Sequence, residues 1–285
     1  MTDLVGLLTE LNVALAAAAM FVLMLRRPFR RIWGPRAAYG LWAILPTAMA
    51  SVCLPRPGIG VMTEAALAPW ATAIVSVWLA GVLVSVVLIA AAQARFAAQA
   101  RRGLAGPAIT GVLIGRLVMP ADSATRWTPE ELAVVRAHER AHRDRGDLRI
   151  NAVVAVLRCL FWANPLAQIA ADRFRFDQEL ACDATVMAMK PGRRRLYAEA
   201  LLKAVPTSPL ALGCSWSAIG VAALETRMAS LKLNCRRPDV FAMACVTVLA
   251  LTMGAAAWRI QPASLQAAAP ASPAVLLIQI RAPSP

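Results

Sequence analysis

The sequence predicts a mainly α-helical, polytopic membrane protein with four transmembrane helices and one soluble domain, helical with a small sheet, between the third and the fourth. Hydrophobic residues make up 59% of the 285 residues and the mean hydropathy is +0.58, which is too apolar for a soluble globular protein. The charges are concentrated: residues 95–239 hold 22 of the 30 Lys and Arg and 13 of the 16 Asp and Glu. This distribution is typical of apolar spans joined to a single soluble domain.

Four apolar runs predict the transmembrane helices. They are Leu4–Leu25, Ala37–Leu54, Leu67–Ala92 and Val240–Trp258. Each has at least 18 residues, which at about 1.5 Å per residue is enough to cross a hydrocarbon core of about 30 Å. We therefore expect a three-helix transmembrane region over residues 1–94 and a fourth span over residues 240–258.

The arginines after the first run predict its orientation. No Lys or Arg precedes this run, whereas the loop RRPFRRIWGPR at residues 26–36 is strongly basic. A secretory signal peptide has the reverse charge order, so we favour a span over that alternative. Because basic loops lie on the cytoplasmic side, we expect the N-terminus outside, residues 95–239 in the cytoplasm, and the Ala/Pro-rich segment 259–285 as a short extracytoplasmic tail.

The charge of the predicted cytoplasmic domain points to membrane lipids as its partner. Its net charge is +9, and arginines next to spans face the anionic lipids of the cytoplasmic leaflet. We find no nucleic-acid motif and expect no direct nucleic-acid binding. Four of the six cysteines lie in this domain and none forms a C-x-x-C pair, so we expect no disulfide framework there.

Both histidines of the chain lie in one short stretch, ELAVVRAHERAHRDRGD, residues 131–147. Thr128-Pro129-Glu130-Glu131 is a capping box with Pro at the first helical position, so we expect a helix over Pro129–Arg145. His138 and His142 are then one turn apart on one face. The alternative is a pair of buried, hydrogen-bonded histidines, but the spaced His-Glu-x-x-His trio favours a metal site.

The chemistry that suits this trio is zinc-dependent hydrolysis. Two neutral imidazoles, a third ligand and a position left for water are the usual catalytic zinc set. Glu139 is placed to accept the proton of that water as it attacks a peptide carbonyl. The sequence therefore predicts a cytoplasmic zinc metallopeptidase domain of the zincin-like type over residues 95–239, with Zn²⁺ as its cofactor and a protein as its substrate.

The third ligand must be a carboxylate, because no histidine remains. Asp144 and Asp147 lie at the end of the histidine helix, where a structural role is favoured. A second helix is predicted over DRFRFDQELACDATVMAM, where Glu179 and Asp183 share a face. One of them can bind the metal and the other can hold the N–H of a ligand histidine. A surface ion pair involving these residues is the alternative.

The apolar segment Ile150–Ala171 could be a fifth span, but that would place Glu179 and the histidines on opposite sides of the membrane. Arg158 and Asn164-Pro165 interrupt it, which favours two short helices folded as a membrane-associated hairpin, either re-entrant or interfacial. Two further cytoplasmic helices are expected in PGRRRLYAEALLKAV and ALETRMASLKLNCRRPD. ITGVLIGRLVMP is expected to be one short strand, either purely structural or able to align an extended substrate.

Four segments in order resemble a known family: VMPAD, WTPEELAVVRAHERAHRDRGD, FWANP and ELACDATVM. The region from about Gly111 to Lys232 is similar to the BlaR/MecR-type membrane zinc metallopeptidases, the beta-lactam sensor-transducers and antirepressors, which also have three spans before this region and one after it. The resemblance implies a multi-pass protein of the bacterial inner membrane. By position it implies zinc ligands at His138, His142 and Glu179, a catalytic base at Glu139 and a supporting residue at Asp183.

In that family the peptidase is activated by an outside signal and leads to loss of a cytoplasmic winged-helix repressor. The best-known members carry a penicillin-binding sensor domain after the last span, whereas 27 residues follow Trp258 here. Beta-lactam sensing is therefore not implied, and an input could reach the loop Pro55–Ala66, the tail or a partner protein. Formation of a homo-oligomer is left open.

Three other functions compete with an antirepressor peptidase. A membrane-bound quality-control metalloprotease would use the same His-Glu-x-x-His and E-x-x-x-D residues. An intramembrane protease is disfavoured, because HERAHRDRGD carries too many charges for the hydrocarbon core. A signalling scaffold without peptidase activity is disfavoured by the intact metal-binding trio.

Overall fold

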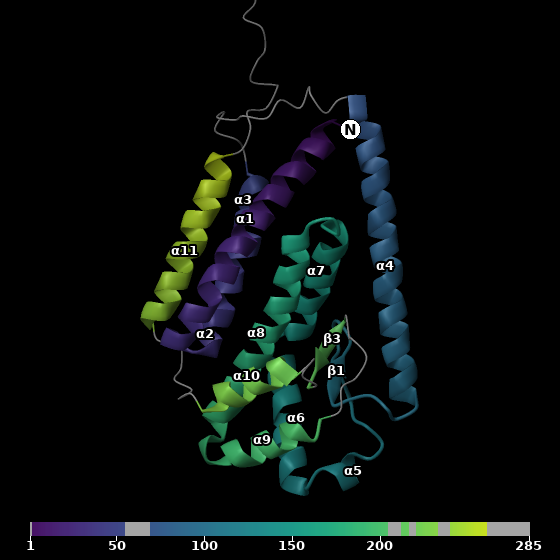
Figure 1. The fold of residues 1–285 in the computed structure, drawn as a ribbon, viewed down its shortest axis with the longest axis vertical. Helices are drawn as coiled ribbons and strands as arrows, with labels where there is room; N and C mark the ends of the chain where they lie inside the picture. The colour runs from purple at the N-terminus through teal and green to yellow at the C-terminus, as the bar shows by residue number, and fades with distance from the viewer. Residues whose placement is uncertain (1, 55–68, 205–211, 217–220, 233–239, 261–285) are drawn as a thin grey trace, which may run out of the picture.

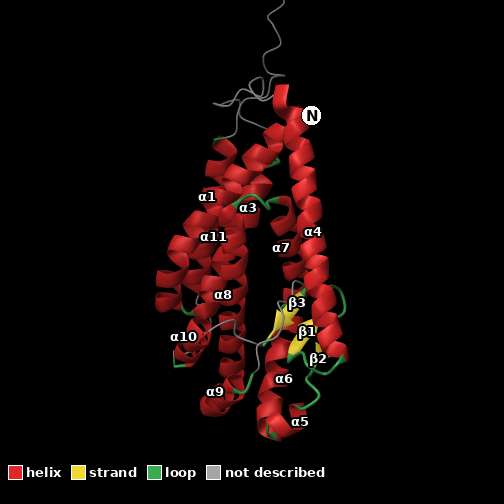
Figure 2. Cartoon of the chain, turned by 45° about the vertical axis from the view of Figure 1, so that its right-hand side comes forward, coloured by secondary structure: helices red, strands yellow, loops and turns green. Residues whose placement is uncertain are grey.

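The computed structural model describes residues 2–54, 69–204, 212–216, 221–232 and 240–260. The predicted outer loop 55–66 and nearly all of the predicted tail lie outside these residues. The described part is mainly helical with one small sheet (Figures 1 and 2). Its helices and strands are α1 (Thr2–Trp33), α2 (Pro35–Gly40), η1 (Leu41–Ala43), α3 (Ile44–Val52), α4 (Ala71–Arg101), β1 (Ala108–Thr110), β2 (Arg116–Val118), α5 (Ser123–Arg126), α6 (Pro129–Asp144), α7 (Asp147–Leu160), α8 (Pro165–Met189), η3 (Pro191–Arg193), α9 (Arg194–Leu202), β3 (Gly213–Ser215), α10 (Val221–Leu231) and α11 (Val240–Arg259).

Three helices of the described part are long and apolar enough to cross a membrane. They are Leu4–Trp33 within α1, Ala71–Arg101, which is α4, and Val240–Arg259, which is α11. The predicted second span, Ala37–Leu54, is helical but is divided by the 3-10 turn η1 into α2 and α3. The crossing of the membrane by residues 37–54, and with it the count of four spans, therefore stays a prediction.

The N-terminal helices and α11 form one bundle. Its core contains buried residues of α1, α2, η1, α3, α8 and α11, among them Val22, Trp42 and Val246. A Cβ on Gly254 of α11 would lie 2.8 Å from the Ser51 hydroxyl, so the absence of a side chain lets α11 approach α3 closely. In Figure 1, α4 stands on the other side of the molecule, and α7 and α8 lie between it and the bundle.

Helices α7 and α8 form a hairpin whose tip contacts both α1 and α4. The side chain of Asn164 caps α8 and also donates hydrogen bonds to Asn12 of α1. On the other side, Trp162 Nε1 lies 3.3 Å from the carbonyl oxygen of Trp78 in α4, and its ring fills the space where Gly81 has no Cβ. Whether the hairpin enters the membrane stays a prediction. Its second arm is one continuous helix of 25 residues, which also includes the separately predicted helix around Glu179.

The sheet has three antiparallel strands in the order β2-β1-β3. The prediction of one strand in ITGVLIGRLVMP is wrong, because this segment folds back on itself as β1, a turn and β2. Gly111 begins the turn with φ = 113°, and a Cβ there would lie 2.3 Å from the carbonyl oxygen of Ile114. Residues other than glycine rarely adopt this backbone conformation.

A second core lies at the end of the molecule opposite the N-terminus, where Figure 1 shows α6, α9 and α10. It buries Trp127, Tyr197 and Trp216 together with Val135 and Val186. Trp127 donates from Nε1 to the carbonyl oxygen of Ala200 at 3.0 Å, so its one polar atom is satisfied. This core packs the predicted histidine helix α6 against α8 and α9.

Candidate metal centre

Helix α6 begins and points as its sequence predicts. The Thr128 hydroxyl accepts from the Glu131 N–H at 3.3 Å, and the Glu131 carboxylate accepts from the Thr128 N–H at 2.8 Å, which is a complete capping box. Helix α6 covers Pro129–Asp144, within one residue of the prediction. Both histidines are fully buried, whereas the arginines of the opposite face, Arg136, Arg140 and Arg143, are exposed.

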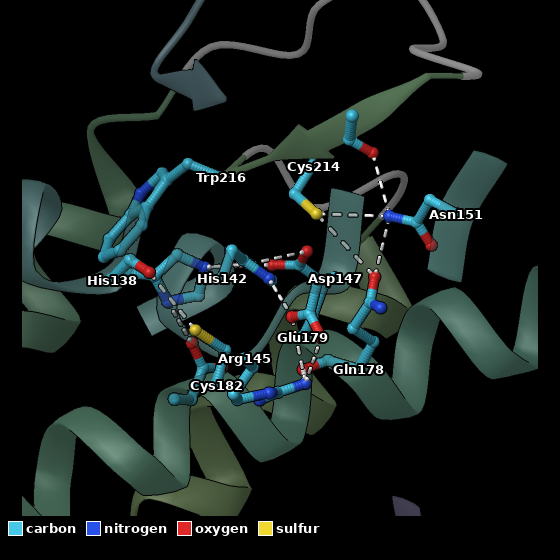
Figure 3. A network of polar contacts seen from close by, with 12 residues as sticks. His138, His142, Arg145, Asp147, Asn151, Gln178, Glu179, Cys182, Cys214 and Trp216 are labelled. Atoms are coloured by element: carbon cyan, nitrogen blue, oxygen red, sulfur yellow. Dashed lines mark hydrogen bonds and ion pairs between the residues drawn. The ribbon is translucent and has the colours of Figure 1, made fainter. Parts of the chain in front are cut away.

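The two histidines and Glu179 converge on one point (Figure 3). The Nε2 atoms of His138 and His142 are 2.9 Å apart. Glu179 of α8 places Oε2 3.2 Å from His138 Nε2 and Oε1 3.3 Å from His142 Nε2. Donors of a tetrahedral zinc ion are separated by roughly 3.4 Å, given bonds of about 2.1 Å. The three side chains therefore have close to the spacing that such an ion requires.

The outer nitrogen of His142 is fixed by Asp147. His142 Nδ1 lies 2.7 Å from Asp147 Oδ2, and the Asp147 carboxylate is fully buried. The carboxylate can only accept, so Nδ1 carries the proton. Arg145 Nη2 holds the same carboxylate at 3.0 Å and packs over the Tyr39 ring of α2.

The outer nitrogen of His138 is fixed through Tyr197. The Tyr197 hydroxyl donates to Asp183 Oδ1 at 2.6 Å, and it accepts from His138 Nδ1 at 2.7 Å. Asp183 Oδ1 itself lies 3.2 Å from the same Nδ1. A hydroxyl has one proton to give, so the proton between Tyr197 and His138 belongs to the histidine. His138 is therefore also protonated on Nδ1.

These tautomers provide the test of whether a metal fits. With both Nδ1 atoms protonated, a neutral imidazole directs its Nε2 lone pair at the other histidine and at the Glu179 carboxylate. Burial lowers the pKa values of His138 and His142, but the neighbouring cysteine and acidic side chains raise both well above the ordinary value, so the point between these atoms attracts positive charge. A divalent cation in place of a proton would form three bonds there, and carboxylates behind ligand histidines are the usual support of such a site. The residues present therefore fit a zinc-type ion.

Arg227 of α10 joins the two acidic residues of α8. It donates to Asp183 from Nε at 2.8 Å and from Nη2 at 2.7 Å, and its Nη1 lies 3.3 Å from Glu179 Oε2. Burial would raise the pKa of Asp183, but the Arg227 charge and the hydrogen bonds from His138 and Arg227 lower it to about 2. Asp183 therefore stays ionised and able to accept from Tyr197.

Glu139 is buried without a hydrogen-bond partner. It is 1% exposed, and neither carboxylate oxygen has a partner among the described residues. Burial raises the pKa of Glu139 to about 7, against the lowering effect of the two histidines. A carboxyl group with a pKa near neutrality and free acceptor atoms is suited to accept a proton from water.

Two cysteines also border the centre. Cys182 Sγ, His138 and His142 offer ligand atoms that all lie within 4.8 Å of one another, and Cys214 forms a similar group with His142 and Asp147. Cys182 donates to the carbonyl oxygen of His138 at 3.3 Å, which ties α8 to α6 next to the histidines. Both sulfur atoms thus belong to the surroundings of the ligand atoms.

The structure brings together all five residues that the sequence singled out. His138, His142 and Glu179 converge, Glu139 is the next residue on α6, and Asp183 reaches His138 chiefly through Tyr197. Sequence reasoning missed Tyr197, Arg227 and Cys182, and it gave Asp147 only a helix-end role. The signal for Tyr197 was its rarity: the chain has two tyrosines, and both contact this network.

Comparison with known proteins places the centre within a region that matches a known family. Residues 97–231 match the family model described as BlaR1 peptidase M56, which covers α6, α8 and most of the second core. The chain is 29% identical over 98 residues to the regulatory protein BlaR1 of Bacillus licheniformis, covering 34% of this chain and 16% of that protein. It is 26% identical over 98 residues to the methicillin resistance mecR1 proteins of Staphylococcus aureus and Staphylococcus epidermidis, covering 34% of this chain and 17% of each.

The buried histidine pair lies within the matched region, which is of the metallopeptidase class. Residues 97–231 thus resemble the BlaR/MecR-type family. The alignment spans about a sixth of the length of these relatives, so their activities, substrates and partners are not carried over by the comparison itself.

Proposed function

We propose that the chain is an integral-membrane zinc endopeptidase in which His138, His142 and Glu179 hold the zinc ion and Glu139 is the general base. Asp183 and Asp147 fix the two histidines. The observation that carries the proposal is the convergence of two Nε2 atoms and a carboxylate within 3.3 Å. The ion, when bound, would polarise a peptide carbonyl and make water more acidic.

Each protein group then has a definite task. Glu139 takes a proton from the attacking water and delivers it to the leaving amine, for which its pKa of about 7 is suitable. Arg227 balances the charge of Glu179 and Asp183, so that the ligand carboxylate stays in place. The hydrogen bonds to both Nδ1 atoms keep the imidazoles in the tautomer that presents Nε2 to the metal.

The proposed substrate is a cytoplasmic or membrane-proximal protein, specifically a winged-helix transcriptional repressor whose loss the protein triggers. The family of the matched region supports the proposal. The proposed topology places the chain in a bacterial inner membrane with four spans, α2–η1–α3 being the second. The basic loop 26–36 supports a cytoplasmic metal centre.

The test combines metal content with proteolysis in the full chain purified into lipid nanodiscs. Wild type is expected to hold one zinc per chain, Glu139→Gln to keep the zinc without cleavage, and Glu179→Ala to lose the zinc. Glu130→Gln is the matched control, because Glu130 is an exposed carboxylate on the same helix. New N-termini in cells expressing wild type but not Glu139→Gln would identify the substrate. A wild-type protein without zinc, or a Glu139→Gln variant with full cleavage, would refute the proposal.

The number of proteins with new N-termini in these cells distinguishes a repressor-directed peptidase from a quality-control protease. One or a few cleaved proteins are expected in the first case, and many misfolded membrane proteins in the second.

A further inference from the structure

The turn between β1 and β2 exposes three consecutive apolar side chains. Residues 111–115 read GVLIG, with Leu113 78% and Ile114 86% exposed and Val112 also exposed. The strand next to the turn has its own buried residue, because Ile109 packs against Leu148 and Cys214. Val112, Leu113 and Ile114, at the tip of the turn, are therefore not part of the hydrophobic core. Such an exposed apolar patch is typical of a surface that binds a partner or a membrane.

The position of this tip along α4 is fixed by polar contacts. At the end of β1, the Thr110 hydroxyl is 3.4 Å from Gln93 Nε2 of α4. Gln93 Oε1 also accepts from the N–H of Leu212, just before β3. Gln93 directly follows the apolar run Leu67–Ala92. If α4 crosses the membrane, Gln93 marks the depth at which its surface changes from apolar to polar.

The direction of β1 places the tip on the membrane side of Gln93. The first residue of β1, Ala108, packs in a small core with Phe96, three residues further along α4, whereas the last residue, Thr110, contacts Gln93. The strand therefore runs antiparallel to α4, toward the apolar run. Two residues beyond Thr110 advance about 6 Å, which is the rise of about four helical residues. The tip thus reaches the level of the last apolar turn of α4.

The polar residues around the tip match this placement. Arg116, directly after the turn, and Arg149, in the first turn of α7, are both exposed. The apolar residues at the tip are suited to contact acyl chains, and the arginines at its base are suited to contact anionic headgroups. A protein partner would not explain why the tip is held at this depth of α4.

We propose that the turn Gly111–Gly115 inserts Val112, Leu113 and Ile114 into the acyl-chain boundary of the cytoplasmic leaflet, and so holds the sheet and the adjacent metal centre against the membrane. The inference rests on the crossing of α4 that the proposed function includes, but not on peptidase activity. It restricts the substrate class to proteins whose cleaved segment lies near the membrane surface.

Depth-dependent fluorescence quenching tests the insertion. Leu113→Cys, in a full chain whose Cys53, Cys235 and Cys245 are replaced by serine, is labelled with bimane and placed in phosphatidylglycerol-containing liposomes. We expect strong quenching by lipids with a doxyl group near the headgroup and a several-fold lower sensitivity to aqueous iodide than for Met189→Cys. Met189 is the matched control, because it is a similarly exposed apolar residue at the far end of α8.

A third labelled position distinguishes a failure of the insertion from a failure of the membrane crossing by α4. Leu83→Cys lies on the exposed surface in the middle of α4. If Leu83→Cys is quenched by deep lipid probes while Leu113→Cys is quenched only by iodide, the insertion is refuted and the crossing of α4 stands. If neither position is quenched by lipid, the crossing itself is refuted. Quenching of both by lipid, with Met189→Cys quenched by iodide, supports the proposal.

Discussion

At the scale of single residues, the two histidines are held by unequal supports. His142 relies on one acidic residue, Asp147. His138 has the Tyr197 hydroxyl at 2.7 Å and the Asp183 carboxylate at 3.2 Å from the same nitrogen. Loss of Asp147 leaves the His142 ring only Cys214 Sγ nearby, a weak acceptor, whereas loss of the hydroxyl leaves the Asp183 carboxylate within reach of His138. The two histidines should therefore respond differently to removal of their partners.

We expect Asp147→Ala to weaken zinc binding by about 10- to 100-fold, the usual effect of removing the partner of a ligand histidine. Tyr197→Phe should weaken it by less than about 10-fold, because Asp183 can accept from His138 directly. The measurement is zinc competition against a chelator of known affinity in nanodiscs. Equal losses in the two variants would show that Asp183 does not replace the hydroxyl.

At the scale of secondary-structure elements, α8 is attached to the N-terminal helices by a buried acidic residue. Asp177 is 1% exposed, and its carboxylate lies 2.8 Å from Arg26 Nη1 and 3.3 Å from Arg30 Nη1. Trp42 Nε1 donates to its other oxygen at 3.0 Å. Two arginines of α1 and the indole of η1 thus hold the helix that carries Glu179, two residues further along the chain.

Removal of this buried carboxylate should be costly, because two arginines would keep their charges without a partner. We expect Asp177→Asn to lower the free energy of unfolding by about 3–5 kcal/mol. The matched control on the same helix is Asp172→Asn, which breaks an exposed pair with Arg158 and should cost less than about 1 kcal/mol. Chemical unfolding in detergent micelles measures both. An Asp177→Asn variant as stable as the control would contradict a structural role for this ion pair.

The elements that depend on local sequence were predicted, and those that depend on distant contacts were not. The extent of α6 and the convergence of its histidines follow from a capping box and a spacing of four. Tyr197 and Arg227 reach the centre from α9 and α10, and no local pattern reports which distant side chain will face a ligand. The β1–β2 turn was missed because the apolar letters VLI continue the strand pattern, although the glycines at 111 and 115 marked its ends.

At the scale of the whole molecule, the proposed metal centre joins elements that the second core also packs together. The proposed ligands come from α6 and α8, and their supports come from α7, α8, α9 and α10. Two imidazole nitrogens and a carboxylate meet within 3.3 Å inside the protein, a point that attracts positive charge. The metal is therefore expected to contribute to folding as well as to chemistry.

Removal of zinc by a membrane-permeant chelator should lower the thermal unfolding temperature of the wild-type chain. At a free metal concentration 100 times the dissociation constant, binding stabilises by about 2.7 kcal/mol. The stabilisation should return when zinc is added back, and it should be absent in Glu179→Ala. Equal unfolding temperatures for the metal-free and zinc-loaded wild type would show that the centre forms without the ion.

Helix α8 is fixed on opposite sides of its axis. At about 100° per residue, Asp177 and Glu179 point roughly 200° apart, the first toward α1 and the second toward the histidines of α6. Rotation of α8 about its own axis would break the contacts of Asp177 and Glu179 together. A movement of α1 can therefore displace Glu179 only if α8 tilts or slides along its axis. For the same reason, a single residue inserted between the two positions would turn one of the carboxylates away from its partners.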